Sequence, residues 1–506
     1  MITSKLQRAI KVALLFLSFA GLPAMANAVT SETIVVDSKA PGKPFIHMWE
    51  HMFGSGRAIL SLRESYRNDL RKTKTVADVK YIRFHNIFHD EVGVYDEDKD
   101  GKPIYNFTYV DQIYDGLLDL GVRPFVELSF MPAKLSNTPP EVHEFWYKPL
   151  VGPPKDWQKW GDLNYQFVKH LVERYGIDEV SQWYFEVWNE PDLDFWKGEP
   201  KKETYFKLYD TAVQAIKRCD KRLRVGGPST ATQEWMADFI EHCVKENVPM
   251  DFVSTHNYAN ESDEKAYKEK PAPRSDVTAN NVKKIYDIVK ASKRPDVPII
   301  WSEYNASWMN EVNVTDSPFM GPWLANNIRQ CDGLASGMSL WTFSDVFEES
   351  GPAKTPFYGG FGLIAPGGIP KASFNALKLL HKLGDVRLPV ESNSVIATRD
   401  KQGDLKLALW NYGPAEKPGT TKDFTVRFNG VPNSNKARIH IVDKDHGSAL
   451  TAWERMGKPQ FPTRQQQAEL MKAAELSEPQ TLPLDQNSEL KMTLAPQTLV
   501  LIEIVP

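Results

Sequence analysis

Short apolar runs alternate with longer amphipathic segments from about residue 44 to residue 383. The short runs are rich in β-branched and aromatic residues, which is typical of buried strands. Eight such runs occur, at 44–50, 79–86, 122–128, 183–189, 223–227, 251–257, 297–303 and 337–343. Eight strand–helix units of this length predict an α/β barrel. An open, doubly wound sheet is the alternative, because periodicity alone does not show whether a sheet closes on itself.

The segments between these runs have apolar residues at steps of three and four, which predicts helices packed with one face on a core. The clearest are 109–121, 162–176, 204–220 and 372–384. Gly121, Gly176 and Gly384 stand near their ends, where a residue with left-handed backbone often terminates a helix. The alternation of strand and helix therefore covers a first unit from 44 to 384.

After Gly384 the sequence pattern changes to short predicted strands separated by turns. Alternating apolar residues appear at 405–413, 423–431 and 437–445, and again towards the end of the chain. This pattern predicts a β-sandwich over 385–506, interrupted by a polar helical insert at 462–476. Residues 29–43 hold one further strand-like run, and we expect it to pair with the sandwich although it precedes the barrel.

The first 28 residues have the pattern of an export signal. Lys5, Arg8 and Lys11 precede an apolar run at 12–28, and Ala26 and Ala28 fit the small-residue positions of a cleavage site. The apolar run is shorter than the roughly 20 residues that a spanning helix needs. The pattern predicts a periplasmic or secreted protein, with an uncleaved anchor as the alternative. Nothing later in the chain resembles a stable membrane span.

Composition and motif spacing argue against several classes of function. The chain has 506 residues, a formal net charge of −4 and 25% charged residues, without the basic block expected of a nucleic-acid-binding protein. Its three cysteines, Cys219, Cys243 and Cys331, lack metal-binding spacing, and an odd number leaves at least one thiol unpaired. A calcium-like start at 96–101 has Phe107 where the loop needs glutamate. We expect no metal and no cofactor.

Polar residues gather where six of the predicted strands end. In an α/β barrel the carboxyl ends of all strands open on one face, where active sites lie. A single buried polar residue has ordinary structural explanations, but the same chemical character at so many strand ends predicts one shared site. The residues are His85, Asn86, Glu127, Asn189, Glu190, His256, Tyr258, Glu303 and Trp341.

Glu190 and Glu303 are the carboxylates to which this pattern gives most weight. Two carboxyl groups that face each other across a sugar suit glycoside hydrolysis, since one protonates the departing oxygen and the other meets the anomeric carbon. A separation of about 5–5.5 Å predicts retention of configuration, and about 6.5–9.5 Å predicts inversion. The structural alternative is an ion pair of either carboxylate with a nearby arginine such as Arg83.

Two segments carry a resemblance to a known family. "WYFEVWNEPDLDFW" (183–196) and "IIWSEYNASW" (299–308) resemble the acid/base and nucleophile motifs of glycoside hydrolase family 39, which includes β-xylosidases and α-L-iduronidase. Similar segments follow in collinear order between about residues 33 and 455: 81–91, 121–132, 224–231, 254–258, 341–351 and 357–377. The resemblance implies an (α/β)₈ barrel with an accessory β-sandwich, in agreement with the periodicity.

The resemblance also implies roles for individual residues. It makes Glu190 the general acid/base and Glu303 the nucleophile of a retaining double displacement. It places Asn189 on the sugar 2-hydroxyl, assigns to two histidines and a tyrosine the orientation of Glu303 and nearby hydroxyls, and assigns Glu348 and Glu349 to the terminal sugar. The implied substrate-binding residues are His85, Asn189, His256, Tyr258, Trp341, Glu348 and Glu349. Trp196 and Trp308 are open between sugar stacking and core packing.

The leading hypothesis is an exported, exo-acting β-xylosidase that trims xylo-oligosaccharides. Other family 39 specificities are the alternatives: α-L-arabinofuranosidase, β-glucosidase or β-galactosidase, and α-L-iduronidase. An iduronidase needs a cation for the substrate carboxylate, whereas Glu348 and Glu349 suggest an acidic neighbourhood that suits neutral sugars. A catalytically inactive carbohydrate-binding protein is a remote alternative. The partner is an oligosaccharide or small glycoside, and assembly into a homo-oligomer stays open.

Overall fold

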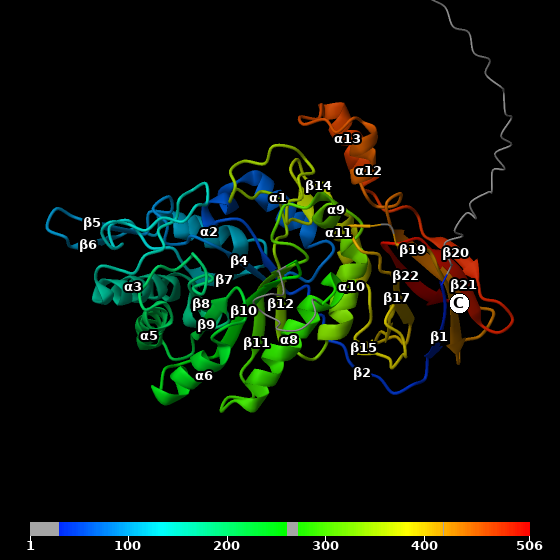
Figure 1. The fold of residues 1–506 in the computed structure, drawn as a ribbon, viewed down its shortest axis with the longest axis horizontal. Coiled ribbons are helices and arrows are strands. Elements are labelled where there is room, and N and C mark those ends of the chain that lie inside the picture. Colours follow the sequence, from blue (N-terminus) through cyan, green and yellow to red (C-terminus); the bar gives the residue numbers. More distant parts are fainter. Residues whose placement is uncertain (1–29, 261–271, 418) are drawn as a thin grey trace, which may run out of the picture.

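The structure, a computed structural model, describes residues 30–506 except 261–271 and 418. The predicted export signal at 1–28 lies outside the described residues. Two bodies make up the described chain, a barrel at the left of Figure 1 and a set of β-sheets at the right.

Eight parallel strands form a closed barrel in the spatial order β10-β11-β12-β3-β4-β7-β8-β9. The closed order confirms the predicted α/β barrel and excludes the open doubly wound sheet. The strands are β3 (Met52–Gly54), β4 (Tyr81–Phe84), β7 (Arg123–Leu128), β8 (Tyr184–Val187), β9 (Arg224–Thr230), β10 (Phe252–Tyr258), β11 (Ile299–Asn305) and β12 (Gly337–Leu340).

The first predicted strand is misplaced. Residues 45–51 form no strand, and β3 begins only at Met52. Phe45, Met48 and Trp49 are nevertheless buried, and the Met48 carbonyl accepts a hydrogen bond from the amide of Met338 beside the barrel. The apolar pattern of 44–50 therefore indicated burial correctly, but the backbone there is a chain of turns.

Helices cover the outside of the barrel. They are α1 (Glu64–Thr73), α2 (Thr108–Leu118), α3 (Trp157–Tyr175), α5 (Lys201–Cys219), α6 (Met236–Lys245), α8 (Arg274–Ala291), α10 (Met320–Cys331) and α11 (Ala372–Leu380), with the short η1 (Ala58–Leu62), α4 (Ile177–Val180) and α9 (Val312–Thr315). Gly176 ends α3 with φ +79°, as predicted. Gly384 does not cap a helix, because α11 already ends at Leu380 and the glycine instead fits closely against the backbone of Arg399.

Two sheets pack face to face after the barrel. One has the order β1 (Thr30–Asp37), β18 (Lys422–Asn429), β21 (Glu489–Leu494); the other has the order β2 (Lys43–Pro44), β15 (Val386–Arg387), β16 (Val395–Arg399), β17 (Leu405–Asn411), β22 (Thr498–Val505), β19 (Lys436–Val442), β20 (Gln480–Pro483). A buried core that includes Ile34, Phe424 and Leu407 fills the space between them. Strand β1 runs parallel to β18 over its whole length. This is the second β unit that the sequence predicted.

The barrel and the sandwich share a continuous apolar contact. Helices α10 and α11 lie between the two bodies (Figure 1), and Trp410, Leu499 and Leu501 of the seven-stranded sheet belong to the barrel's own core cluster. Since the second face of that sheet is covered by barrel helices, the sheet is buried on both sides.

Smaller elements decorate this frame. The predicted polar insert at 462–476 forms α13 (Arg464–Ala473), which Thr463 begins with a capping box, and α12 (Leu450–Arg455) precedes it. Two short hairpins are β5 (Tyr95–Glu97) with β6 (Pro103–Tyr105), and β13 (Ile364–Ala365) with β14 (Ile369–Pro370).

Cys219, Cys243 and Cys331 are all free thiols, and the last two are buried, as expected for small apolar residues. Within residues 30–260, 272–417 and 419–506, no helix has both the length and the apolar character that crossing a membrane requires.

Candidate active site

The strand ends of the barrel bring the predicted site residues together. His256 and Tyr258 lie in β10, Glu303 lies in the adjacent β11, and the pairing register sets His256 directly beside Glu303. Glu190 follows β8, with a left-handed backbone (φ +44°) and its amide bonded to the Ser229 carbonyl at 2.9 Å. This sharp turn at the end of β8 places the Glu190 side chain over the barrel mouth.

The two carboxylates face each other. An oxygen of Glu190, an oxygen of Glu303 and the Nδ1 atom of His256 all lie within 4.8 Å of one another. Glu190 is 8% exposed and Glu303 is 5% exposed, so both side chains are nearly removed from water. This separation matches the close pair of a retaining glycosidase and is too small for the water-filled gap of an inverting one.

Arg83 of β4 holds several of these groups at once. Its guanidinium lies 3.1 Å from Glu303, 2.7 Å from Glu186 and 2.8 Å from Glu127, and its Nη2 donates to the Oδ1 atom of Asn189 at 2.8 Å. The ion pair that was the structural alternative for Glu303 thus exists. It does not replace the proximity of Glu303 to Glu190, because one buried cation is shared among three carboxylates.

Two effects oppose each other at Glu303. Burial raises the pKa of this carboxyl to about 7, while Arg83, the charge of His85 and the Tyr258 hydroxyl favour its ionised form. The Tyr258 hydroxyl donates a hydrogen bond to Oε1 of Glu303. Burial and the neighbouring Glu303 raise the pKa of Tyr258 well above its usual value, so the tyrosine keeps its proton as a donor.

His256 is a neutral partner of Glu190. Its Nδ1 atom lies 2.9 Å from Oε1 of Glu190 but 3.7 Å from Oε2 of Glu303, and its Nε2 atom lies 3.2 Å from the hydroxyls of Ser229 and Ser302. Burial lowers the pKa of His256 well below its usual value, and the charges of Arg83 and His85 add to this effect. The hydrogen-bond distance is therefore to Glu190, whereas the resemblance assigned His256 to Glu303 and the hydroxyls.

His85 contacts other carboxylates. Its Nδ1 atom lies 2.7 Å from Glu127, and its Nε2 atom lies 3.6 Å from Glu349. Burial works against the charged form, yet Glu127 and Glu349 raise the pKa of His85 to about 9. His85 is thus a buried cation that connects β7 to the loop carrying Glu349, and its 2.7 Å hydrogen bond is to Glu127 rather than to Glu303.

Glu348 and Glu349 are not an unbalanced acidic pair. Glu348 forms ion pairs of 2.8 Å with Arg57 and 2.5 Å with Arg63. Although burial acts in the opposite direction, these arginines lower the pKa of Glu348. Glu349 faces the charged His85. The prediction that this loop makes its neighbourhood acidic was wrong, because the balancing cations come from a segment far away in the sequence.

The tryptophans divide clearly. Trp341 is 1% exposed, with its ring against Gly54 of β3 and 4.7 Å from the ring of His85. The close approach requires glycine at position 54, since any Cβ there would collide with the indole. Trp196 is fully buried and bonds to the Lys201 carbonyl, which settles its role as packing. Trp308 is 57% exposed and stays available for contact with a ligand.

Sequence reasoning missed several residues that organise the site. They are Glu186, Ser229, Ser302, Arg57 and Arg63. One signal was present for Glu186: a charged residue stands in the middle of the apolar run "WYFEVW", where only a buried partner makes it tolerable. Arg83 stands in the same way inside "YIRF" and had been considered only as an ion-pair partner.

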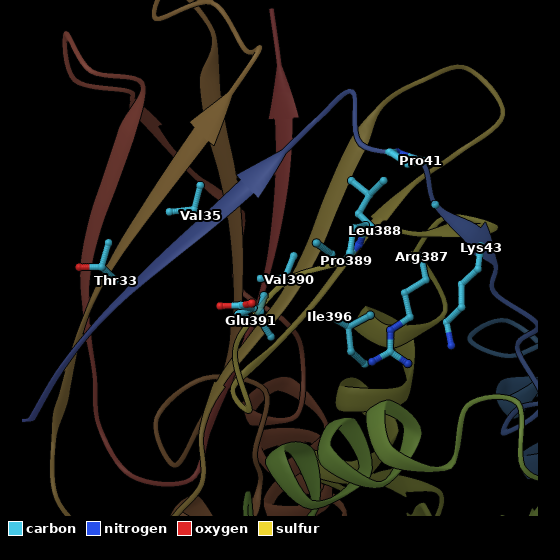
Figure 2. A pocket seen from close by; sticks show the side chains of 13 residues that line it. Thr33, Val35, Pro41, Lys43, Arg387, Leu388, Pro389, Val390, Glu391 and Ile396 are labelled. Atoms are coloured by element: carbon cyan, nitrogen blue, oxygen red, sulfur yellow. The ribbon is translucent and has the colours of Figure 1, made fainter.

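A cavity also lies away from the barrel mouth. A hollow of about 870 Å³ opens in the sandwich between β1 and the segment that leads into β16 (Figure 2). Its walls include the aliphatic side chains of Val35, Leu388 and Val390, and its two cations, Lys43 and Arg387, both pair with Asp332. None of the predicted site residues lines it. The chemistry of the barrel mouth and this hollow are therefore separate features.

Comparison with known proteins agrees with this geometry. The sequence profile described as "Glycosyl hydrolases family 39" matches residues 32–487. A β-xylosidase of Geobacillus stearothermophilus is 38% identical over 428 residues, covering 82% of this chain and 84% of the relative. A β-xylosidase of Caldicellulosiruptor saccharolyticus is 36% identical over 441 residues, covering 85% and 88%.

A solved structure agrees over the whole described fold. The crystal structure of a monomeric β-xylosidase from Caulobacter crescentus CB15 has a TM-score of 0.84 at 33% identity, and the match covers 94% of this chain and 99% of that one. Both carboxylate motifs lie inside the matched family region. This chain belongs to glycosyl hydrolases family 39 and is a retaining glycoside hydrolase.

Proposed function

We propose that this protein is an exo-acting β-xylosidase that releases terminal xylose from xylo-oligosaccharides by double displacement. The observation that carries the proposal is the convergence of Glu190 and Glu303 within 4.8 Å, in a chain that is 36% and 38% identical to β-xylosidases over most of both sequences. The geometry supports the reaction type, and the relatives support the sugar.

In the first step Glu303 attacks the anomeric carbon while Glu190 gives its proton to the departing glycosidic oxygen. The bond to the leaving group breaks as the ester bond to Glu303 forms. His256 supports Glu190 from one side through the 2.9 Å contact of its Nδ1 atom. Arg83 and Tyr258 bond to opposite oxygens of Glu303 and so fix the direction in which it attacks.

In the second step water attacks the glycosyl–enzyme ester, and Glu190 now accepts the proton of that water. Esterification removes the negative charge of Glu303, which makes ionised Glu190 easier to form beside it. Asn189 contributes to both steps. Its Oδ1 atom is occupied by Arg83 at 2.8 Å, so its amide nitrogen is oriented to donate to the sugar 2-hydroxyl, a bond expected to strengthen at the transition state.

Recognition of a chain end is the second part of the proposal. The loop after β12 carries Glu348 and Glu349, and it is held by Arg57 and Arg63 from the segment after β3. The Trp146 amide donates to the Glu349 carbonyl at 2.8 Å, which joins a third segment to this loop. Such fixed carboxylates suit hydroxyls of a terminal sugar and support exo action, with Trp341 packed beneath.

This arrangement of charges suits a uronic acid less well than a neutral sugar. Three cations lie beside the proposed sugar-binding loop and all are already paired, Arg57 and Arg63 with Glu348 and His85 with Glu127 and Glu349. A substrate carboxylate would have to displace one of these glutamates. The balance of charge therefore favours a neutral sugar over an iduronoside, although the net acidity that the sequence suggested is absent.

We also propose that the protein is exported to the periplasm or beyond, on the basis of the basic, apolar and small-residue pattern of residues 1–28. Fractionation of cells that express the full chain, with N-terminal sequencing of the mature protein, tests this. Cleavage near Ala28 supports export, and intact protein in the cytoplasm contradicts it.

A panel of matched chromogenic glycosides tests the sugar assignment. We expect 4-nitrophenyl β-xyloside to give the highest kcat/KM, above the α-L-arabinofuranoside, β-glucoside, β-galactoside and α-L-iduronide, and we expect the first product detected by NMR to be β-xylose. Xylohexaose should give xylose and xylopentaose as its first products, whereas internal cleavage would give xylobiose, xylotriose and xylotetraose early. Strong arabinoside turnover without xyloside turnover would refute the proposed specificity. Inactivity on every glycoside would favour the binding-protein alternative.

A further inference from the structure

The catalytic carboxylates and His256 have the arrangement of a transition-metal site. The Nδ1 atom of His256 lies 2.9 Å from Oε1 of Glu190 and 3.7 Å from Oε2 of Glu303. All three donor atoms lie within 4.8 Å of one another, and all three side chains are buried. One imidazole nitrogen and two carboxylate oxygens are ordinary ligands of zinc.

The separations suit a metal. Two donors that are each about 2.05 Å from Zn²⁺ subtend an angle of roughly 90° when they are 2.9 Å apart and roughly 130° when they are 3.7 Å apart, which brackets the tetrahedral angle. The Glu190 and Glu303 oxygens lie within 4.8 Å of each other, and Oε2 of Glu303 also contacts Arg83 at 3.1 Å, so rotation of the carboxylate groups must accompany binding to a common ion. The ion would lie between the two carboxylates, where the anomeric carbon of the substrate would otherwise sit.

The surroundings of His256 leave the required lone pair available. Its Nε2 atom faces the hydroxyls of Ser229 and Ser302, both at 3.2 Å, and either hydroxyl can accept the Nε2 proton. In the tautomer that carries its proton on Nε2, Nδ1 is unprotonated and directed at the carboxylates. A metal-bound histidine usually has such a partner for its second nitrogen.

The local charge also favours a cation. Five carboxyl groups surround the site, and they are Glu127, Glu186, Glu190, Glu303 and Glu349. Arg83 and His85 form ion pairs with four of them, Glu127, Glu186, Glu303 and Glu349.

A second cluster has two histidines and a single carboxylate. His47, Glu50 and His381 meet on the opposite side of the barrel from the active site, before β3 and after α11. The imidazole nitrogens lie 2.8 and 2.6 Å from the two Glu50 oxygens. Among the described residues, Nε2 of His47 is buried without a partner. This cluster provides a matched control.

We propose that Glu190, His256 and Glu303 bind one borderline-soft divalent cation, Zn²⁺ or Cu²⁺, and that the bound ion inhibits the enzyme by occupying the position of the sugar. The inference rests on the proposed catalytic roles of the two carboxylates only for the mode of inhibition. Hard Mg²⁺ prefers six oxygen ligands and should not compete at this site.

Zinc titration of the full enzyme tests the proposal by two independent readouts. Calorimetry should show one Zn²⁺ per chain, and kinetics with whichever chromogenic glycoside is turned over should show a raised KM with unchanged kcat. With free zinc at ten times its inhibition constant, mass action predicts a rise in apparent KM of about tenfold. Excess chelator should restore the original KM, and Mg²⁺ at the same concentration should leave it unchanged.

Variants decide which cluster binds. Glu190→Gln and His256→Asn, measured by calorimetry alone, should each weaken zinc binding at least tenfold, whereas His381→Gln should bind zinc and be inhibited as the wild type is. Circular dichroism checks that each variant is folded. If Glu190→Gln or His256→Asn does not fold, the other variant alone tests the site. Zinc affinity unchanged in the folded Glu190→Gln or His256→Asn variant, zinc binding lost in His381→Gln, or inhibition that lowers kcat alone would overturn the proposal.

Discussion

The guanidinium of Arg83 lies 3.1 Å from the Oε2 atom of Glu303, a residue 220 positions further along the chain. The same guanidinium forms ion pairs with Glu127 and Glu186. One buried cation therefore orients the proposed nucleophile and balances the charge of two further buried carboxylates. Interior charge and catalytic geometry are therefore inseparable in this barrel. A change at Arg83 should affect both stability and activity.

Replacement of Arg83 by methionine should lower the free energy of unfolding by about 3–5 kcal/mol, because three buried carboxylates lose their cation. Arg83→Lys keeps the charge but not the planar fork, and should lose less stability while still reducing kcat. Urea denaturation with a kinetic assay measures both effects. Arg71→Met, at a half-exposed arginine of α1, should stay within about 0.5 kcal/mol of the wild type. Wild-type stability of Arg83→Met would contradict the shared-cation account.

Activity should decline on the acid side of neutrality. Glu303 must be ionised to attack, and burial raises its pKa to about 7. The ionised fraction falls as pH drops through that value, so kcat/KM should fall about tenfold for each pH unit well below 7. A pH–rate profile on a chromogenic xyloside measures this limb. An acid limb centred near pH 4 would show that Arg83 and Tyr258 outweigh burial.

Glu190→Ala should lose its general acid and base but keep the nucleophile. The expected drop in kcat/KM is about 10²–10⁴-fold for substrates with poor leaving groups, and smaller for an activated aryl glycoside that needs no protonation. Azide should restore turnover of the aryl glycoside, with a glycosyl azide as product. The matched control is Glu234→Gln, at an exposed glutamate, which should show neither loss nor rescue. If azide leaves the Glu190→Ala rate unchanged, the assignment fails.

A buried triad should control the sugar-binding loop. Lys371 lies 2.6 Å from both Asp316 and Asp345, with all three side chains fully buried, and Asp345 stands three positions before Glu348. Lys371→Met should cost about 3–5 kcal/mol of stability and raise KM more than it lowers kcat, since the loop loses its anchor. Lys378→Met, on the exposed side of α11, should be neutral. Thermal unfolding and Michaelis–Menten kinetics on both variants decide the matter.

The fold was predictable because its signals are local. Apolar periodicity identified seven of the barrel strands. The change near Gly384 from alternating strands and helices to short strands and turns identified the sandwich. The strand at 44–50 was wrong because burial of Phe45, Met48 and Trp49 gives the same apolar signature in a turn as in a strand. Closure of the barrel could be inferred only from the number of units.

The site was predictable where function places polar residues at strand ends, as for Glu190 and Glu303. It was less predictable where roles depend on distant partners. The pairing of Glu348 with Arg57 joins residues 291 positions apart, and no sequence pattern shows it. The Nδ1 atom of His256 lies 2.9 Å from Glu190 and 3.7 Å from Glu303. Sequence motifs do not predict a difference in distance of less than an ångström.

Trapping of the glycosyl–enzyme tests the central claim most directly. An activated 2-deoxy-2-fluoro-β-xyloside should inactivate the enzyme, since the fluorine slows the second step more than the first, and peptide mass spectrometry should find one fluoroxylosyl group per chain on Glu303. Label on any other residue, Glu190 included, would contradict the assignment of Glu303 as the nucleophile.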